Sequence, residues 1–364
     1  MSELMDQFLE LSPSPLIPVL PDDLTVDIVA RVPISHYPTL SLVSKKFRKL
    51  IASHKLYKRR SLLGCKEHRV YAVLRNSKTG EGRFCILHRK VNCSNRLVVI
   101  GSIPPVSPRG SFVAVGSKTY VFNDVDALSI DCTSHTVQPL PDMPQRFSKS
   151  PIPSKFANVI DGKVYLIGDS RLTWDRGILW VKTVMVLDTE TQTWELPVMI
   201  KHDMRVGAIW SDSVMLEGKI YMKGFRNGYS VVYGPEEKKW ESMDEVMNSK
   251  GWEGACVIDD VLYYHDCSGK ALRAFDPKQK SGWSVVNGLE DFLAAETTQS
   301  KWSNVVKCGE KKLALFFPKK HVICFAEISL EMRQGGEIWG KLESCDVVIE
   351  DELLDMVKCV AVMV

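Results

Sequence analysis

Three tryptophans mark an internal repeat, which constrains the fold more than any other feature of the chain. Trp194, Trp240 and Trp283 are 46 and 43 residues apart. Each tryptophan ends a unit that holds two short runs rich in β-branched and aromatic residues, with turn residues between them. A period of roughly 40 to 50 residues is typical of the four-stranded blades of β-propellers. The repeat therefore predicts a propeller.

The local chemistry of one unit is consistent with a blade. Asp161-Gly162-Lys163 predicts a tight turn into an inner strand, and Asp188 to Thr191 predicts the hairpin before the outer strand. Trp194 is expected to pack the outer strand against the neighbouring blade. The pattern resembles the kelch family in a degenerate form, because the usual Gly-Gly pair survives only as Gly168-Asp169 and Gly224-Phe225.

Weaker units flank the three clear ones and bring the expected count to six blades over residues 68–364. Seven blades remain an alternative, whereas a WD40 propeller is disfavoured because no Gly-His and Trp-Asp pairs recur. A propeller must close its ring or leave an exposed sheet edge. We therefore expect the strand-like end Val357–Val364 to pair beside Val70–Leu74.

The N-terminal region has a helical period. In the first of two patterns, Leu24, Ile28 and Val32 fall on one face of a helix that Pro33 ends. In the second, which Pro38 starts, one stripe is expected to hold Leu40, Val43, Phe47 and Leu50. A segment this small cannot bury both stripes within itself, so part of the apolar surface is expected to meet a partner.

The amino-acid sequence of this region resembles an F-box. The resemblance rests on Leu20 to Leu24, Ile28 to Pro33 and Leu42 to Ile51. Ser44 replaces the commoner Cys, and Tyr37-Pro38 departs from a usual Asp-Leu pair. The resemblance implies an F-box over residues 18–64, after a flexible leader at 1–17, that docks a Skp-type adaptor. The implied adaptor-facing and supporting residues are Leu20, Pro21, Ile28, Val29, Val32, Pro33, Leu40, Val43 and Phe47.

Composition bounds the class of protein. The chain of 364 residues is 45% hydrophobic and carries a net charge of +3, too small to imply nucleic acid for the whole chain. A basic run over 45–60 is expected to be the solvated back of helices, although phosphate binding or a nuclear signal is an alternative. No secretory signal or membrane span is expected, and ten cysteines without a C-x-x-C pair indicate reduced thiols in cytoplasm or nucleus.

The common catalytic motifs are missing, and the histidines show no metal-ligand spacing. Tyr264 to Cys267 collects four potential ligands, but neighbours on a strand point to opposite faces, so a blade-end turn is expected. We predict no catalytic, metal or cofactor site. The loops at one mouth of the ring are instead expected to bind a target, because arginine and tryptophan often anchor interfaces. The candidates are Arg109, Arg146, Arg171, Trp174, Arg205, Arg226, Trp252 and Trp302.

Together these patterns predict a mainly β protein: a six-bladed kelch-type propeller after a small helical F-box. The resemblance implies a non-catalytic substrate receptor of an SCF ubiquitin ligase, bound through a Skp-type adaptor to a cullin. The propeller would hold a target protein for ubiquitination. A kelch scaffold or small-molecule sensor is the alternative, and a propeller oxidase is a weaker one.

Overall fold

The chain divides into two units, Met1–Cys65 and Lys66–Val364. The computed structural model describes residues 20–364, apart from 91–92, 148–154, 175–176, 200–208, 280–281 and 298–299. At 90, 93–94, 171–174, 177–180 and 227 it describes the backbone only. Among the described helices, none has the length and apolar character needed to cross a bilayer.

The first unit is helical. Its elements are α1 (Asp22–Arg31), the 3-10 turn η1 (Ile34–His36), α2 (Tyr37–Val43), α3 (Lys45–Ile51) and α4 (His54–Leu62). The prediction of one continuous stripe from Leu40 to Leu50 is wrong, because Ser44 is extended, with φ of −160°, and separates α2 from α3. The Ser44 hydroxyl accepts a hydrogen bond from the Phe47 amide at 3.1 Å, so it acts as the N-cap of α3.

A buried arginine holds the helical unit together. Arg60 is 1% exposed, and its guanidinium donates to the carbonyls of Ala30, Val32 and Cys65 at 2.6 to 2.9 Å. It also donates to the hydroxyl of Tyr37, which in turn donates to the carbonyl of Val29. The carbonyls in the last turn of a helix have no partner within the helix. Arg60 therefore satisfies the end of α1 and fixes the chain after it.

Replacing Arg60 with Met should destabilise the helical unit by about 3 kcal/mol, because a charged donor is lost and buried carbonyls stay unpaired. Amide hydrogen exchange of α1 and α4 in the full chain would measure this loss. Lys58→Met, an exposed position on the same helix, is the matched control. Equal protection in the two variants would contradict the structural role of Arg60.

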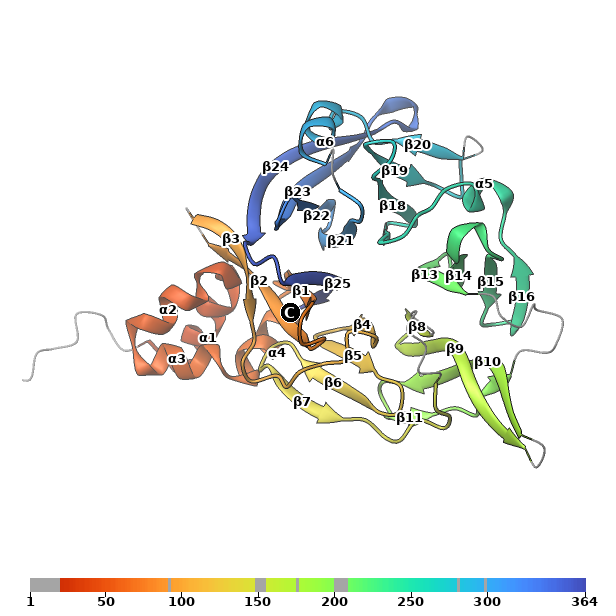
Figure 1. The fold of residues 1–364 in the computed structure, drawn as a ribbon. Helices are drawn as coiled ribbons and strands as arrows, with labels where there is room; N and C mark the ends of the chain where they lie inside the picture. Colours follow the sequence, from red (N-terminus) through yellow and green to blue (C-terminus); the bar gives the residue numbers. More distant parts are fainter. Residues whose placement is uncertain are drawn as a thin grey trace, which may run out of the picture. The chain divides into compact units, whose positions relative to one another are not determined.

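The second unit is a ring of six β-sheets, the blades (Figure 1). From its innermost strand outward, the first blade contains β25 (Leu354–Met363), β1 (His68–Asn76), β2 (Gly82–Lys90) and β3 (Cys93–Val99). The second contains β4 (Ser111–Val115), β5 (Lys118–Phe122), β6 (Ala127–Asp131) and β7 (Thr136–Pro139). The third contains β8 (Lys155–Ile160), β9 (Lys163–Trp174), β10 (Gly177–Asp188) and β11 (Thr193–Trp194), and β12 (Val198–Met199) also pairs with β10.

The remaining three blades follow in chain order. The fourth contains β13 (Trp210–Leu216), β14 (Lys219–Gly224), β15 (Val231–Gly234) and β16 (Lys239–Ser242). The fifth contains β17 (Cys256–Ile258), β18 (Val261–Asp266), β19 (Ala271–Phe275) and β20 (Trp283–Val285). The sixth contains β21 (Asn304–Gly309), β22 (Lys312–Lys319), β23 (Val322–Met332) and β24 (Ile338–Ile349). The short helices α5 (Glu245–Asn248) and α6 (Glu290–Glu296) and the turns η2 (Phe225–Asn227) and η3 (Gln334–Gly336) lie in connections. The predicted six blades are confirmed.

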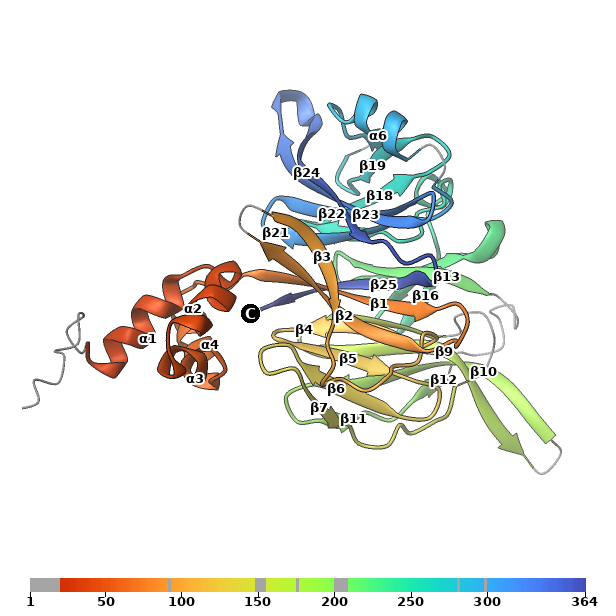
Figure 2. The ribbon, with the colours of Figure 1, turned by 60° about the vertical axis from the view of Figure 1, so that its left-hand side comes forward.

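The end of the chain closes the ring, as predicted. Strand β25 pairs antiparallel with β1 and becomes the innermost strand of the first blade, so one sheet contains both ends of the propeller unit (Figure 2). The innermost strands contact each other in the cyclic order β25, β4, β8, β13, β17, β21 and back to β25. Each of the six blades therefore has a neighbouring blade on both sides.

The repeat tryptophans pack blade against blade. Trp194 on β11 meets Phe122 of the preceding blade edge to face, with ring centroids 6.0 Å apart. Trp240 on β16 stacks on Trp210, with an angle of 5° between the ring planes, and packs against a cluster that includes residues of the preceding blade. The indole of Trp283 donates to the carbonyl of Val246 at 2.8 Å. The predicted role of these side chains is confirmed.

The acidic-glycine pairs form the turns between the first and second strands of a blade. Asp161 and Gly162 have φ of 49° and 75°, and Glu217 and Gly218 have φ of 48° and 72°. Two consecutive positive φ values define the type I′ hairpin turn, whose twist matches that of the paired strands. This turn chemistry explains why the same short motif returns in successive blades.

Candidate functional site

An apolar face of α1 is open to solvent. Leu24 and Ile28 lie four residues apart in α1 and are 52% and 53% exposed, and Leu20, two residues before the helix, is 42% exposed. The opposite side of the helix, with Val26, Val29 and Ala30, is buried. Of the predicted stripe Leu24, Ile28 and Val32, the first two side chains thus point away from the core of their own unit, whereas Val32, which follows α1, is half-buried. Leucine and isoleucine at this spacing and exposure are typical of a docking surface.

Five of the nine predicted adaptor-contact positions are exposed: Leu20, Pro21, Ile28, Pro33 and Val43. Val32, Leu40 and Phe47 are half-buried, and Val29 is 3% exposed, so Val29 supports the helix from behind. The list omitted Leu24, which the helical spacing marks, and Leu42 and Leu62, which are 77% and 70% exposed. No period in the sequence distinguishes those two from core leucines.

Ion pairs between α1 and α4 frame this surface. Arg59 binds Asp27 through two bonds of 2.6 and 2.7 Å, and Lys55 binds Asp23 at 2.8 Å. The hydrogen bond from Arg59 lowers the pKa of Asp27 below its ordinary value. Beside these pairs lies a hollow of about 360 Å³ whose apolar walls include Leu24 and Leu62. Several cations of the basic run over 45–60 are therefore engaged with α1.

The propeller presents a second candidate site at one end of its channel. The loops that enter the innermost strands and the loops between second and third strands lie on the same face, because successive strands of a blade alternate in direction. A pocket of about 180 Å³ opens there, with walls from every blade. It is lined by Pro108, Arg109, Gly110, Ser111, Phe112, Lys155, Phe156, Ala157, Ser211, Asp212, Ser213, Gly254, Asn304, Val357 and Lys358. We call it the mouth pocket.

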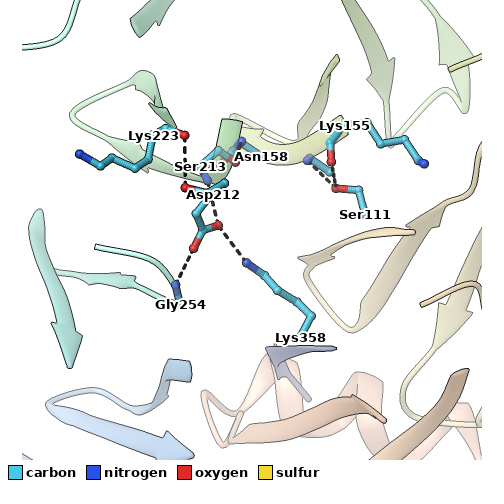
Figure 3. Close-up of polar contacts among 10 residues, drawn as sticks. Ser111, Lys155, Asn158, Asp212, Ser213, Lys223, Gly254 and Lys358 are labelled. Atoms are coloured by element: carbon cyan, nitrogen blue, oxygen red, sulfur yellow. Dashed lines mark hydrogen bonds and ion pairs between the residues drawn. The ribbon is translucent and has the colours of Figure 1, made fainter. Parts of the chain in front are cut away.

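An ion pair crosses the channel inside this pocket (Figure 3). Lys358 on β25, in the first blade, lies 3.3 Å from the carboxylate of Asp212 on β13, in the fourth. The same carboxylate accepts hydrogen bonds from the amides of Ser213 at 2.8 Å and Gly254 at 2.7 Å. Asp212 is 5% exposed, so this charge is buried and hydrogen-bonded on both oxygens.

Polar contacts link the tops of neighbouring innermost strands (Figure 3). The Ser111 hydroxyl joins β4 to β8 through the Lys155 carbonyl and the Ala157 amide. The Asn158 side chain donates to the Ser213 hydroxyl at 2.8 Å, which joins β8 to β13. Gly254 has φ of +69°, and an added Cβ there would clash with the carbonyl oxygen of Ser303, so the position requires glycine.

Three buried lysines stabilise the blades around the pocket. Lys155 is 2.6 Å from Asp124, and Lys182 is 2.7 Å from Asp169 and 4.1 Å from the centre of the Trp210 ring. Lys223 donates to both oxygens of Asn248. Burial lowers the pKa of each of these lysines below its ordinary value. Their sequence positions give no sign of burial, and sequence reasoning missed them.

The predicted mouth residues separate into different environments. Arg109 lines the mouth pocket, and Arg146 and Arg226 are exposed. Trp252 is fully buried among apolar residues of two blades, so its assignment to a binding surface is wrong. Trp302 is half-buried and packs against the core between the sixth and first blades.

Three further predicted mouth residues cannot be placed as side chains. Arg171 and Trp174 lie near the end of β9, where the backbone alone is described, and Arg205 lies outside the described residues. Their predicted contact with a target stays a prediction.

The run Tyr264 to Cys267 ends β18 and begins a turn. Burial lowers the pKa of His265 to about 4, and Asp266 pairs with Arg273 at 2.7 Å. Burial raises the pKa of the Cys267 thiol, which argues against a reactive thiolate. Within the described part of the chain, no group of three or more His, Cys, Asp or Glu side chains is placed to hold a metal ion.

The helical unit and the propeller define a class of protein that joins an F-box to a kelch propeller. A family model for the F-box domain matches residues 17–59, and the model for the FKB95 Kelch-repeats domain matches residues 75–349. The chain belongs to the F-box/kelch-repeat family.

Curated relatives from Arabidopsis thaliana match along nearly the whole chain. The F-box/kelch-repeat protein At4g38940 is 41% identical, over 96% of this chain and 95% of its own length. The putative F-box/kelch-repeat protein At3g10510 is 32% identical over 95% of this chain and 96% of its own. The F-box/kelch-repeat protein At4g39240 is 34% identical over 95% and 91%. The predicted resemblance is confirmed.

Proposed function

We propose that this protein is a substrate receptor of an SCF-type ubiquitin ligase. In this role the F-box binds a Skp-type adaptor, and the adaptor connects it to a cullin. The propeller binds the target protein at its mouth, and other subunits carry out the ubiquitin transfer in the cytoplasm or nucleus. The protein itself would then need no catalytic group.

One observation carries the proposal: α1 of the F-box exposes Leu24 and Ile28 on one face, and Leu20, just before the helix, is exposed as well. The exposure of three aliphatic side chains on a small helical unit to water is unfavourable. A complementary apolar groove on a partner would remove them from water, and the pairs Lys55–Asp23 and Arg59–Asp27 would lie near such an interface.

Copurification tests the proposal. The full chain, expressed with an affinity tag in plant cells, should recover a Skp-type adaptor and a cullin. Leu20→Ala combined with Pro21→Ala should recover much less of both, because the change removes apolar contacts at the start of α1. If a folded double variant recovered as much adaptor and cullin as the wild type, the result would contradict the ligase-receptor role.

A further inference from the structure

Among the described residues, the wall of the mouth pocket carries hydrogen-bond donors that are not fully used, on Lys358 and Ser213. An ammonium group has three donors, and the Lys358 ammonium has Asp212 as its partner within the described part of the chain. Lys358 is also 35% exposed at its side chain. Asp212 has both oxygens engaged by backbone amides. The Ser213 hydroxyl accepts from Asn158, and among the described residues its own hydrogen has no acceptor.

The charged side chains of the pocket wall are also suited to a negatively charged group. Lys155 is balanced by Asp124, and Lys358 by Asp212. Arg109 is exposed at the rim, and within the described residues its guanidinium has no hydrogen-bond or ion-pair partner. The pocket wall therefore carries the uncompensated positive charge of Arg109, together with the Lys358 ammonium group, which is partly exposed.

Backbone irregularities place both members of the cross-channel pair. In β25, Lys358 pairs with Val73 and Met356 with Leu74, which leaves Val357 as an extra residue. In β13, Trp210 pairs with Gly224 and Asp212 with Lys223, which leaves Ser211 extra. Such β-bulges re-aim neighbouring side chains and are common beside functional sites. Two bulges on facing strands thus turn Lys358 and Asp212 toward the same pocket.

We propose that the mouth pocket binds a carboxylate group. Lys358 and Arg109 contact the carboxylate oxygens, and the Ser213 hydroxyl donates a third hydrogen bond. A carboxylate fits better than a phosphate group, because a dianion would meet one uncompensated cation and the nearby negative charge of Asp212. The carboxylate comes either from an acidic side chain of the target, which rests on the proposed function, or from a free small carboxylic acid.

A titration of the full chain in complex with its adaptor tests this proposal. The probes are N-acetylglutamate α-methylamide, which carries one side-chain carboxylate, the matched glutamine compound, and butyrate. Ligand-observed nuclear magnetic resonance measures the dissociation constants. The glutamate compound should bind at least tenfold more tightly than the glutamine compound. Butyrate binding as tightly as the glutamate compound identifies a free acid as the ligand, and weaker butyrate binding identifies a target side chain.

Variants locate the site. Arg109→Gln should weaken the binding of the glutamate compound at least tenfold, and Lys358→Met should weaken it further. Lys341→Gln, a lysine that is 77% exposed on β24, is the control and should bind as wild type does. Because Lys358→Met leaves Asp212 without its cation, its melting temperature is measured first, and Arg109→Gln alone carries the test if the other variant does not fold.

Equal binding of the two capped amino acids, no binding of any carboxylate, or unchanged binding by Arg109→Gln would each overturn the carboxylate site. Adaptor capture in the same samples separates this outcome from failure of the proposed function. If the adaptor is not captured, the titration is repeated on the full chain alone. Carboxylate binding would then leave a small-molecule or peptide receptor without the ligase role.

Discussion

Deleting residues 357–364 is expected to unfold the propeller. This segment forms most of the innermost strand of the first blade, where it pairs with β1 over most of its length. Cys359, Val360, Val362 and Val364 are at most 8% exposed. Burial of each such side chain contributes about 1.5 to 3 kcal/mol, so the total is on the order of 6 to 12 kcal/mol. That is comparable with the whole stability of a typical domain.

Soluble yield and thermal unfolding measure the effect, and a milder pair of variants controls for it. Val362 is fully buried in β25, whereas Val347 in β24 is 40% exposed. Val362→Ala should cost about 2 kcal/mol, while Val347→Ala should change stability by less than about 0.5 kcal/mol. A truncated chain that melts as the full one does would show that β25 is dispensable for ring closure.

The architecture of the propeller could be predicted because its signals are local and repeated. The turn at Asp161-Gly162 and the anchor at Trp194 each depend on a few neighbouring residues, and the repeat spacing then sets the blade count. Closure by β25 followed from the cost of an open sheet edge. The long hairpin of β9 and β10, which projects from the third blade in Figure 2, had no such signal.

The helical boundaries were harder to predict because a single side chain decides one of them. The spacing of apolar residues continued smoothly from Leu40 to Leu50, yet Ser44 caps a new helix in the middle of that stretch. A serine inside an apolar period is compatible with either a helix interior or an N-cap. Periodicity alone therefore could not place the break.

The candidate site at the mouth shows the same limit more clearly. Arg109 was found because its position before an innermost strand follows from the repeat. Trp252 has a similar position but is buried, since sequence position does not tell a loop anchor from a core side chain. Asp212 and Lys358 are separated by 146 residues and meet only because the ring closes. Neither residue lies in a motif that would mark it.

The second large effect concerns the exposed face of α1. The combined change Leu24→Ala and Ile28→Ala should weaken adaptor binding by roughly 30- to 1000-fold, the equivalent of about 2 to 4 kcal/mol. Both side chains are more than half exposed in this chain, so their truncation removes few contacts within the F-box. Alanine is also the best helix former, which favours a folded α1 in the variant.

A binding measurement with purified adaptor would give this change directly, and circular dichroism would confirm that the helices remain. Leu196→Ala, at a leucine that is 90% exposed on the propeller, is the matched control and should bind as wild type does. Unchanged affinity in the α1 variant would mean that another surface of the F-box contacts the adaptor. The exposed pair Leu42 and Val43 at the end of α2 would then be the next apolar surface to test, because it is the other strongly exposed aliphatic pair among the described F-box residues.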